Sequence, residues 1–229
     1  MKPTVLLFDI DGTLVTTGGA GRRAMSRAFD QVCGRADALD GLRFGGMTDW
    51  GIVRWGFEKV TGPPEDVQIQ ALLEVYLSAL EDEVSKLRSC VAHPGVEALL
   101  DAVSGQRRVA VGLATGNVEA GARTKLARIG LWERFGFGGF GCDHEVRSEL
   151  LVAGAKRGAA LLGEPWRECR VVVIGDTPKD VTAAKEIGAL CVAVATGTYS
   201  LEELAETDAD LVVPDLLDSA TLATYLSAG

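Results

Sequence analysis

Hydrophobic residues occur in short uninterrupted runs that alternate with longer segments of mixed polarity. The runs at residues 5–8, 109–114, 171–174, 190–195 and 211–213 are rich in β-branched side chains, as expected of strands buried on both faces of a parallel sheet. Between them, amphipathic helices are expected at residues 94–103, 118–129, 148–162 and 178–187. This alternation predicts an α/β fold, a Rossmann-like parallel sheet with helices on both faces.

One long interval interrupts the alternation. The chain between the first strand and residue 109 has helical patterning and no convincing strand, with helices expected at residues 22–32, 49–60 and 65–87. Glycine-rich pieces at residues 18–21 and 45–46 punctuate it as turns or flexible joints. We therefore expect an all-helical domain at residues 17–89, inserted into an α/β core made of residues 1–16 and 90–229.

Two carboxylates directly follow the first strand. Asp9 and Asp11 stand two residues apart in an extended segment, so their side chains project to the same side while Ile10 packs on the other. In open α/β sheets this place, beyond the carboxyl ends of the strands, is where ligands bind. Because two close carboxylates raise each other's pKa unless a cation lies between them, Mg²⁺ is the natural third component of the site.

Two further strands also end in polar residues. Thr115, Gly116 and Asn117 follow the strand at 109–114, and their hydroxyl, amide and backbone N–H groups at a helix start can cradle an anion. The alternative is that Thr115 and Asn117 only cap the helix. Asp176 and Asp180 follow the strand at 171–174. For Asp180 alone, a turn or a helix cap is the alternative role.

These strand ends resemble, in order and position, the motifs of the haloacid dehalogenase-like hydrolase superfamily. Residues 9–13 (DIDGT) match its first motif, Thr115 its second and residues 175–180 (GDTPKD) its fourth. Residues 93–96 (HPGV) and 113–117 (LATGN) are similar to members related to phosphoglycolate phosphatase. The resemblance covers nearly the whole chain, and it implies that the helical insertion is a cap domain that closes over the site and selects the substrate.

The resemblance also implies a role for each matching acid. Asp9 would be the nucleophile that forms an aspartyl-phosphate, and Asp11 would act as general acid and then as general base. Mg²⁺ would be held by the Asp9 carboxylate, the main-chain carbonyl of Asp11 and Asp176. Asp180 would orient the basic residue of the site or a metal-bound water.

Thr115, with the backbone amides of Gly116 and Asn117, would hold the phosphoryl oxygens. The family's third motif, often a lysine followed by proline, departs from the usual pattern here. By its position before the helix at 148–162, Arg147 is our candidate for the basic residue, because arginine keeps the charge and can bind phosphoryl oxygens in a bidentate manner. Lys156 is the alternative, although it should lie more than two turns further along that helix.

Within the cap, we expect Arg22 and Asp49 to contact the substrate, although a solvated helix surface explains Arg22 equally well. The presence of Asp11 favours phosphoryl transfer to water over dehalogenation. A sugar phosphomutase would also use Asp11 and is the main alternative, although the cap has no histidine before His93 to serve its acid–base cycle. A receiver-like signalling module is a weaker alternative, because the long insertion and Asp11 have no place in it.

Composition restricts the partners. With 23 Lys+Arg against 32 Asp+Glu, the formal net charge is -9, which repels nucleic acid and anionic membranes. The first apolar run is too short for a signal peptide or a membrane span, and five scattered cysteines without a Cys-x-x-Cys pair suggest a reducing cytoplasm. The sequence thus predicts a cytoplasmic, Mg²⁺-dependent phosphatase acting on a small phosphorylated metabolite, with phosphoglycolate as the named candidate. It leaves the oligomeric state open.

Overall fold

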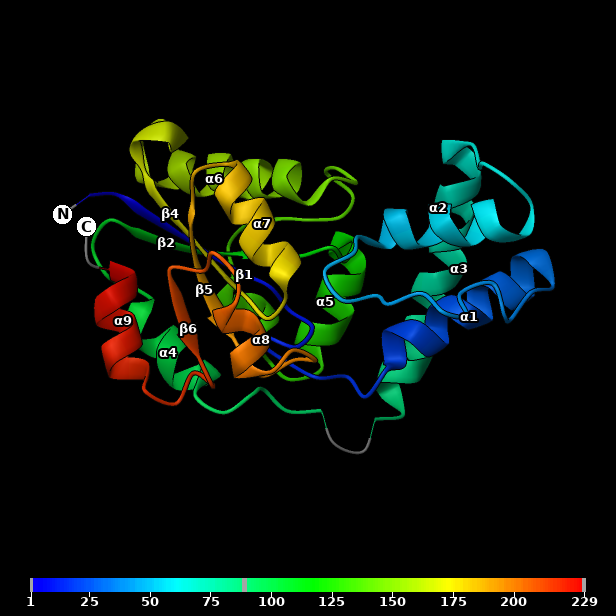
Figure 1. The fold of residues 1–229 in the computed structure, drawn as a ribbon, viewed down its shortest axis with the longest axis horizontal. Helices are drawn as coiled ribbons and strands as arrows, with labels where there is room; N and C mark the ends of the chain where they lie inside the picture. The colour runs from blue at the N-terminus through cyan, green and yellow to red at the C-terminus, as the bar shows by residue number, and fades with distance from the viewer. Residues whose placement is uncertain (1, 88–89, 228–229) are drawn as a thin grey trace.

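The computed structural model describes residues 2–87 and 90–227. Within them, six parallel strands form the sheet at the centre of the larger part of the molecule (Figure 1). The order β3-β2-β1-β4-β5-β6 is that of a doubly wound sheet, which confirms the predicted Rossmann-like class. The strands are β1 Thr4–Phe8, β2 Val109–Ala114, β3 Gly138–Gly139, β4 Arg170–Gly175, β5 Leu190–Val194 and β6 Leu211–Val213.

Strand β1 lies between β2 and β4, and its five residues are all buried. Its last residue, Phe8, stands opposite Leu113 of β2 and Ile174 of β4. The three strands are therefore in register at their carboxyl ends. The residues that follow them therefore meet at one edge of the sheet. At this edge the strand order reverses, with β2 and β3 on one side of β1, and β4, β5 and β6 on the other.

Helices cover both faces of the sheet, and alternate residues of β1 point to each. Leu6 and Phe8 pack in a cluster with helices of one face, and Val5 and Leu7 in a cluster with helices of the other. On the first face lie α4 Val96–Val103, α5 Glu119–Ala127 and α9 Ser219–Ser227, and on the second α6 Arg147–Leu162 and α7 Pro178–Glu186 (Figure 1). Short helices at Trp132–Arg134, Trp166–Glu168 and Leu201–Ala205 (α8) complete the connections.

The inserted helices pack mainly on one another and stand to one side of the sheet (Figure 1). They are α1 Ala20–Cys33, α2 Asp49–Val60 and α3 Asp66–Ser85. We call these helices and the loops between them the helical module. In its buried cluster, which also contains Tyr76, the rings of Phe29 and Phe57 meet edge-on with centroids 5.4 Å apart. The predicted domain boundary between residues 89 and 90 adjoins residues 88–89, which lie outside the described residues, so it stays a prediction.

Most predicted elements occur within a few residues of their expected limits, and helices α8 and α9 occur in addition, without having been predicted. The helix expected from residue 94 begins at Val96, because Gly95 precedes it with φ 86°, and a Cβ on Gly95 would lie 2.0 Å from the carbonyl oxygen of Leu216. Strand β3 was not predicted. It consists of two glycines that pair with β2, and a Cβ on Gly139 would lie 1.9 Å from the carbonyl oxygen of Leu150 in α6.

Among the described residues, no helix combines the length and the apolar character needed to cross a membrane.

Candidate active site

Three carboxylates converge beyond the ends of β1 and β4. Asp9 directly follows β1, Asp176 directly follows β4, and Asp180 lies in the first turn of α7. All three are buried, and one oxygen from each lies within 4.8 Å of the others. The register of β1 and β4 thus brings together three acids that are far apart in the sequence.

Asp180 is fixed by the start of its own helix. Its Oδ2 accepts hydrogen bonds from the backbone N–H of Thr177 at 3.0 Å and from the Thr177 hydroxyl at 2.7 Å, in a capping box that opens α7. Its Oδ1 accepts from Nε and Nη2 of Arg147, the former at 2.9 Å. Asp180 therefore caps a helix and also orients a basic side chain, so the two roles weighed from the sequence coexist.

Arg147, the first residue of α6, joins this cluster. Its side chain is buried, and Nη2 lies 3.3 Å from Oδ1 of Asp9. Lys156, the sequence-based alternative, is exposed on the same helix. The structure therefore places Arg147 beside Asp9, while the chemical role of Arg147 remains a prediction.

Burial shapes the protonation of the cluster. It raises the pKa of Asp9 to about 6, although the Arg147 guanidinium opposes the shift. Burial also raises the pKa of Asp176 to about 8, with repulsion from Asp180 and Asp9 adding to it. A cation bound between Asp9 and Asp176 would stabilise the ionised forms of both carboxylates, which burial disfavours.

The residues present fit Mg²⁺, which prefers oxygen ligands. The Asp176 carboxylate lies in a narrow gap, since a Cβ on Gly12 or Gly197 would come within 2.3 or 1.7 Å of its Oδ2. Both oxygens of Asp180 already accept hydrogen bonds, so Asp9 and Asp176 are the carboxylates with capacity for a metal. The Asp11 side chain lies outside the three-carboxylate cluster, and its predicted contribution was the main-chain carbonyl.

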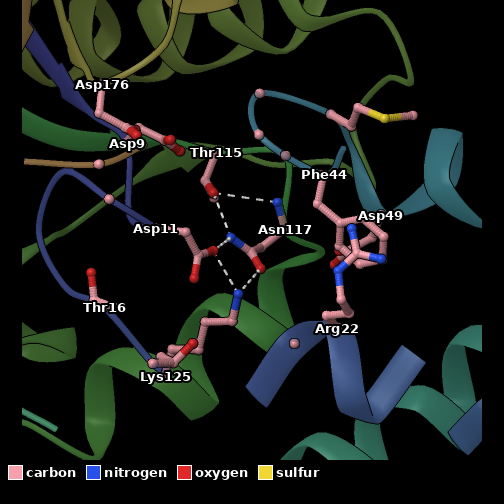
Figure 2. A pocket seen from close by; sticks show the side chains of 18 of the residues that line it. Asp9, Asp11, Thr16, Arg22, Phe44, Asp49, Thr115, Asn117, Lys125 and Asp176 are labelled. Carbon is pink, nitrogen blue, oxygen red and sulfur yellow. Dashed lines mark hydrogen bonds and ion pairs between the residues drawn. The ribbon is translucent and has the colours of Figure 1, made fainter. Parts of the chain in front are cut away.

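The side chain of Asp11 points instead toward α5 (Figure 2). Its Oδ2 accepts from Nδ2 of Asn117 at 2.8 Å and from Nζ of Lys125 at 2.6 Å. Lys125 Nζ also donates to Oδ1 of Asn117 at 2.6 Å, and Asn117 Nδ2 donates to the Thr115 hydroxyl at 2.7 Å. These four residues form a continuous hydrogen-bond network on one wall of the site.

Thr115 and Asn117 do not cap the helix that follows them. Helix α5 has no side-chain cap from its own N-cap residue, Val118. The backbone N–H of Val118 donates at 2.9 Å to Oδ2 of Asp49, which belongs to the helical module. The polar groups of Thr115 and Asn117 therefore face the site and each other, and their predicted contact with phosphoryl oxygens is not in competition with capping.

Asp49 and Arg22, the two residues of the helical module that we expect to contact the substrate, also contact other residues of the protein. Asp49 is buried, its backbone N–H donates at 2.7 Å to the carbonyl oxygen of Gly116, and burial raises its pKa to about 6 against the opposing effect of Lys125. The Arg22 guanidinium stacks on the ring of Phe44 at 3.9 Å (Figure 2). Both residues line the cavity described next, and their contact with a substrate remains a prediction.

A cavity of about 400 Å³ lies between the sheet and the helical module. Its sheet side is polar and its module side is largely apolar. The sheet side includes Asp9, Asp11, Thr115, Asn117, Lys125, Arg147 and Asp176, and the module side includes Arg22, Met25, Phe44, Ile52 and Tyr76. This volume suits a small molecule with one strongly polar end.

Direct contacts seat the module on the sheet around this cavity. Thr48 donates its hydroxyl to the carbonyl oxygen of Glu145 at 3.1 Å, and Arg54 Nε lies 2.9 Å from Oε2 of the same residue. A Cβ on Gly116 would lie 2.0 Å from the carbonyl oxygen of Met47, so the backbones touch where the module meets the loop after β2. These contacts hold the module against the loops beside the cavity.

Lys125 was missed from the sequence, although a signal for it exists. It lies next to Leu126 and three residues after Ala122, and both of these apolar residues are buried under the sheet. A lysine on the buried face of an amphipathic helix is unusual unless it is paired. The sequence could therefore have flagged Lys125, but not its partner.

The fold and the site define an α/β protein with a buried acidic centre at a strand edge, enclosed by a helical module. A family model of haloacid dehalogenase-like hydrolases matches residues 3–188. The chain belongs to this family, which confirms the resemblance drawn from the motifs and the assignment of the protein as a hydrolase.

Known proteins resemble the chain over almost its whole length. The probable phosphatase IndB of Dickeya dadantii (strain 3937) is 26% identical, over 93% of this chain and 90% of that protein. Among solved structures, a hydrolase from Pseudomonas syringae has a TM-score of 0.70 at 24% identity, covering 98% of this chain and 100% of that one. CbbY from Rhodobacter sphaeroides, in complex with phosphate, has a TM-score of 0.71 at 17% identity, covering 95% and 96%. The two structures share the fold.

Proposed function

We propose that the protein is a Mg²⁺-dependent phosphatase that hydrolyses a small phosphate monoester through an aspartyl-phosphate on Asp9. The observation that carries this proposal is the position of Asp9, which lines the cavity with Arg147 at 3.3 Å on one side and Asp176 nearby. Asp11 lines the same cavity from the next turn of chain. The similarity to a protein named as a probable phosphatase and the fold shared with a phosphate-bound protein support it.

In the first step, a carboxylate oxygen of Asp9 attacks phosphorus and the bond from phosphorus to the ester oxygen breaks. The electron pair of that bond goes to the ester oxygen, which takes a proton from the Asp11 carboxyl group and leaves as an alcohol. Asp9 is then an acyl phosphate, and Asp11 is a carboxylate. The Arg147 guanidinium, already at 3.3 Å from Asp9, can donate to the phosphoryl oxygens as charge develops on them.

In the second step, the Asp11 carboxylate takes a proton from a water molecule that attacks phosphorus. The bond between phosphorus and the Asp9 oxygen breaks, and its electron pair restores the Asp9 carboxylate. Inorganic phosphate leaves, and Asp11 is again protonated for the next cycle. The Thr115 hydroxyl and the amides that follow it hold the phosphoryl oxygens during both steps.

Asp9, Asp176 and the main-chain carbonyl of Asp11 would hold Mg²⁺, which when bound neutralises charge on the transferring phosphoryl group. Asp180 keeps Arg147 in place by the hydrogen bonds described above. Asp180 therefore positions Arg147 and does not hold the metal, because both of its carboxylate oxygens already accept hydrogen bonds.

The cavity argues for a compact substrate. About 400 Å³ is a volume that a small metabolite can fill. Phosphoglycolate is our candidate, on the strength of the local similarity of residues 93–96 and 113–117 to phosphoglycolate phosphatase relatives. A small phosphorylated molecule as the partner, and the cytoplasm as the location, belong to the same proposal.

The proposal is tested by measuring phosphate release from a panel of small phosphate monoesters, with and without Mg²⁺, for the wild type and Asp9→Asn. Asp208→Asn, at an exposed position that does not line the cavity, is the matched control. We expect Mg²⁺-dependent release by the wild type and the control, and a loss of at least about a thousandfold in Asp9→Asn. Full activity of Asp9→Asn, or no release from any ester, would overturn the proposal.

A second measurement tests the intermediate and separates hydrolysis from isomerisation. Asp11→Asn, incubated with p-nitrophenyl phosphate, should gain the mass of one phosphoryl group on Asp9, because nitrophenolate leaves without a proton while the attacking water lacks its base. A sugar phosphomutase would instead convert a sugar phosphate to its isomer and release little phosphate.

A further inference from the structure

Lys125 is a buried cation whose bonds all lead to the active site. It sits two turns into α5, and its side chain is 4% exposed. Nζ donates to Oδ2 of Asp11 and to Oδ1 of Asn117, each at 2.6 Å (Figure 2). Removing an ammonium group from water is costly unless strong partners replace the water. This lysine is therefore retained in the core by two residues of the site.

The same bonds determine where Asp11 can place its carboxyl group. The Asp11 side chain is 43% exposed and directly precedes a turn, so without partners it would be free to rotate into the cavity or away from it. Lys125 and the Asn117 amide both hold Oδ2, and within residues 2–87 and 90–227 Oδ1 has no hydrogen bond. One oxygen is thus anchored, and the other is left to exchange a proton.

The hydrogen bonds of Lys125 run to Asp11 and Asn117, while its charge also opposes the rise that burial causes in the pKa of the nearby Asp49. The other buried ion pairs of the site connect to a helix cap, as Arg147 does through Asp180. Lys125 pairs instead with the side chain of Asp11 and with Asn117, which itself bonds to Asp11 and Thr115. The bonding pattern points to control of one side chain.

We propose that Lys125 is a positioning residue for departure of the ester oxygen: by anchoring Oδ2 of Asp11, it keeps Oδ1 placed to give its proton to that oxygen as the bond to phosphorus breaks. The inference rests on the proposed phosphatase function and on Asp11 as the proton donor. In this role the body of α5 contributes to catalysis, in addition to the loop with Thr115 that precedes the helix. Lys125 contacts neither phosphate nor metal in this role.

The dependence of rate on the leaving group distinguishes positioning of a proton donor from any general damage. Phenyl phosphate and p-nitrophenyl phosphate differ little in size, but phenolate is the stronger base and depends more on protonation as it leaves. The quantity to measure is kcat/KM at fixed pH and saturating Mg²⁺, because it reports the steps up to release of the phenol. The variants are Lys125→Met, Asp11→Asn and the double variant.

We expect Lys125→Met to lower kcat/KM by about 30-fold or more for phenyl phosphate and by less than about threefold for p-nitrophenyl phosphate. Asp11→Asn should show the same selective loss, and the double variant should lose no more than Asp11→Asn alone, since the two residues act as one unit. Arg123→Met, which removes an exposed cation from the same helix, should leave both values within about twofold of the wild type.

The ratio of the two kcat/KM values in one sample does not depend on how much of the protein is folded. If Lys125→Met does not accumulate, Lys125→Gln, which keeps a donor but loses the charge, is measured in the same way. Equal losses for both esters, no loss for either, or additive losses in the double variant would overturn the proposal and leave the phosphatase function standing. A wild type that hydrolyses neither ester would overturn both.

Discussion

The Arg147 guanidinium bridges two buried carboxylates, with Nη2 at 3.3 Å from Asp9 Oδ1 and Nε donating to Asp180 Oδ1 at 2.9 Å. Asp180 is held in turn by Thr177 at the start of α7. The position of the charge beside Asp9 is therefore set by a helix cap and exists before any substrate binds. Such preorganised charge stabilises a transition state without reorganisation during the reaction.

Replacing Arg147 with methionine should cost both activity and stability. We expect kcat to fall at least about 100-fold, because a donor to the transferring group is lost, and the free energy of unfolding to fall by about 3–5 kcal/mol, because Asp180 is left buried and unpaired. Lys156→Met on the same helix is the matched control and should leave both quantities nearly unchanged. Steady-state kinetics and urea unfolding measure them. Activity lost in the control and kept in Arg147→Met would show that the basic residue was misassigned.

Removing the Asp176 carboxylate should remove the cation site. Its pKa of about 8 reflects burial and the repulsion of Asp180 and Asp9. A bound divalent cation would stabilise the ionised carboxylate against both effects. We expect Asp176→Asn to weaken Mg²⁺ binding about 100-fold or more in isothermal titration calorimetry, while Asp208→Asn binds as the wild type does. Because a ligand that binds the native state raises stability, Mg²⁺ should also raise the Tm of the wild type and not of Asp176→Asn. Equal Mg²⁺ affinities would contradict the assignment.

Asp49 should make stability depend on pH. Its pKa is about 6 in the folded protein against an ordinary 3.8, so the native state binds this proton more tightly than the unfolded state does. The stability that the proton contributes is complete below about pH 4 and is lost as pH rises through about 6, a loss of roughly 3 kcal/mol at most.

The measurement is the free energy of unfolding in urea for the wild type and Asp49→Asn across this range. Asparagine keeps an oxygen to accept from the backbone N–H of Val118 and has no proton to lose. We therefore expect the wild type to lose stability relative to the variant as pH rises. Parallel curves would mean that Asp49 titrates normally, as an exposed carboxylate does.

Gly116→Ala should disturb the seating of the helical module. The added Cβ would lie 2.0 Å from the carbonyl oxygen of Met47, so one backbone has to move. We expect a lower Tm and a decrease of at least about tenfold in kcat/KM, because a displacement of about 1 Å at the cavity misplaces the substrate. Gly136→Ala, where the new Cβ meets nothing within 4 Å, is the control and should be nearly neutral. A neutral Gly116→Ala would show that this contact opens freely.

The sequence predicts the part of this structure that local patterns determine. The apolar runs identify the long strands, and the order of Asp9, Thr115 and Asp176 along the chain predicts which residues meet, because parallel strands in register end at one edge. Strand β3 escapes such a pattern because it consists of two glycines, which have no apolar side chains, and at Gly139 the backbone of α6 leaves no room for one.

What the sequence does not reveal is pairing between side chains from different elements. Lys125 reads as an anomaly on an apolar helix face, but its partner Asp11 lies 114 positions away. From the sequence, Asp49 at the start of α2 is expected to contact the substrate. In the structure its carboxylate also accepts a hydrogen bond from the backbone N–H of Val118, 69 positions away at the start of α5. Such contacts depend on how the helical module sits on the sheet, which periodicity along the chain does not encode.

The buried side chains of the helical module form a core almost separate from those around the sheet. Among the described residues, Val118 is its one buried member that lies outside residues 17–89. Substitutions within that core can reshape the wall that meets the organic part of a substrate while leaving the packing around β1 and β4 unchanged. The residues that shape the substrate-facing wall and the residues that carry the chemistry can therefore change largely independently, because Val118 is the one buried apolar side chain of the described core residues that packs within the module's cluster.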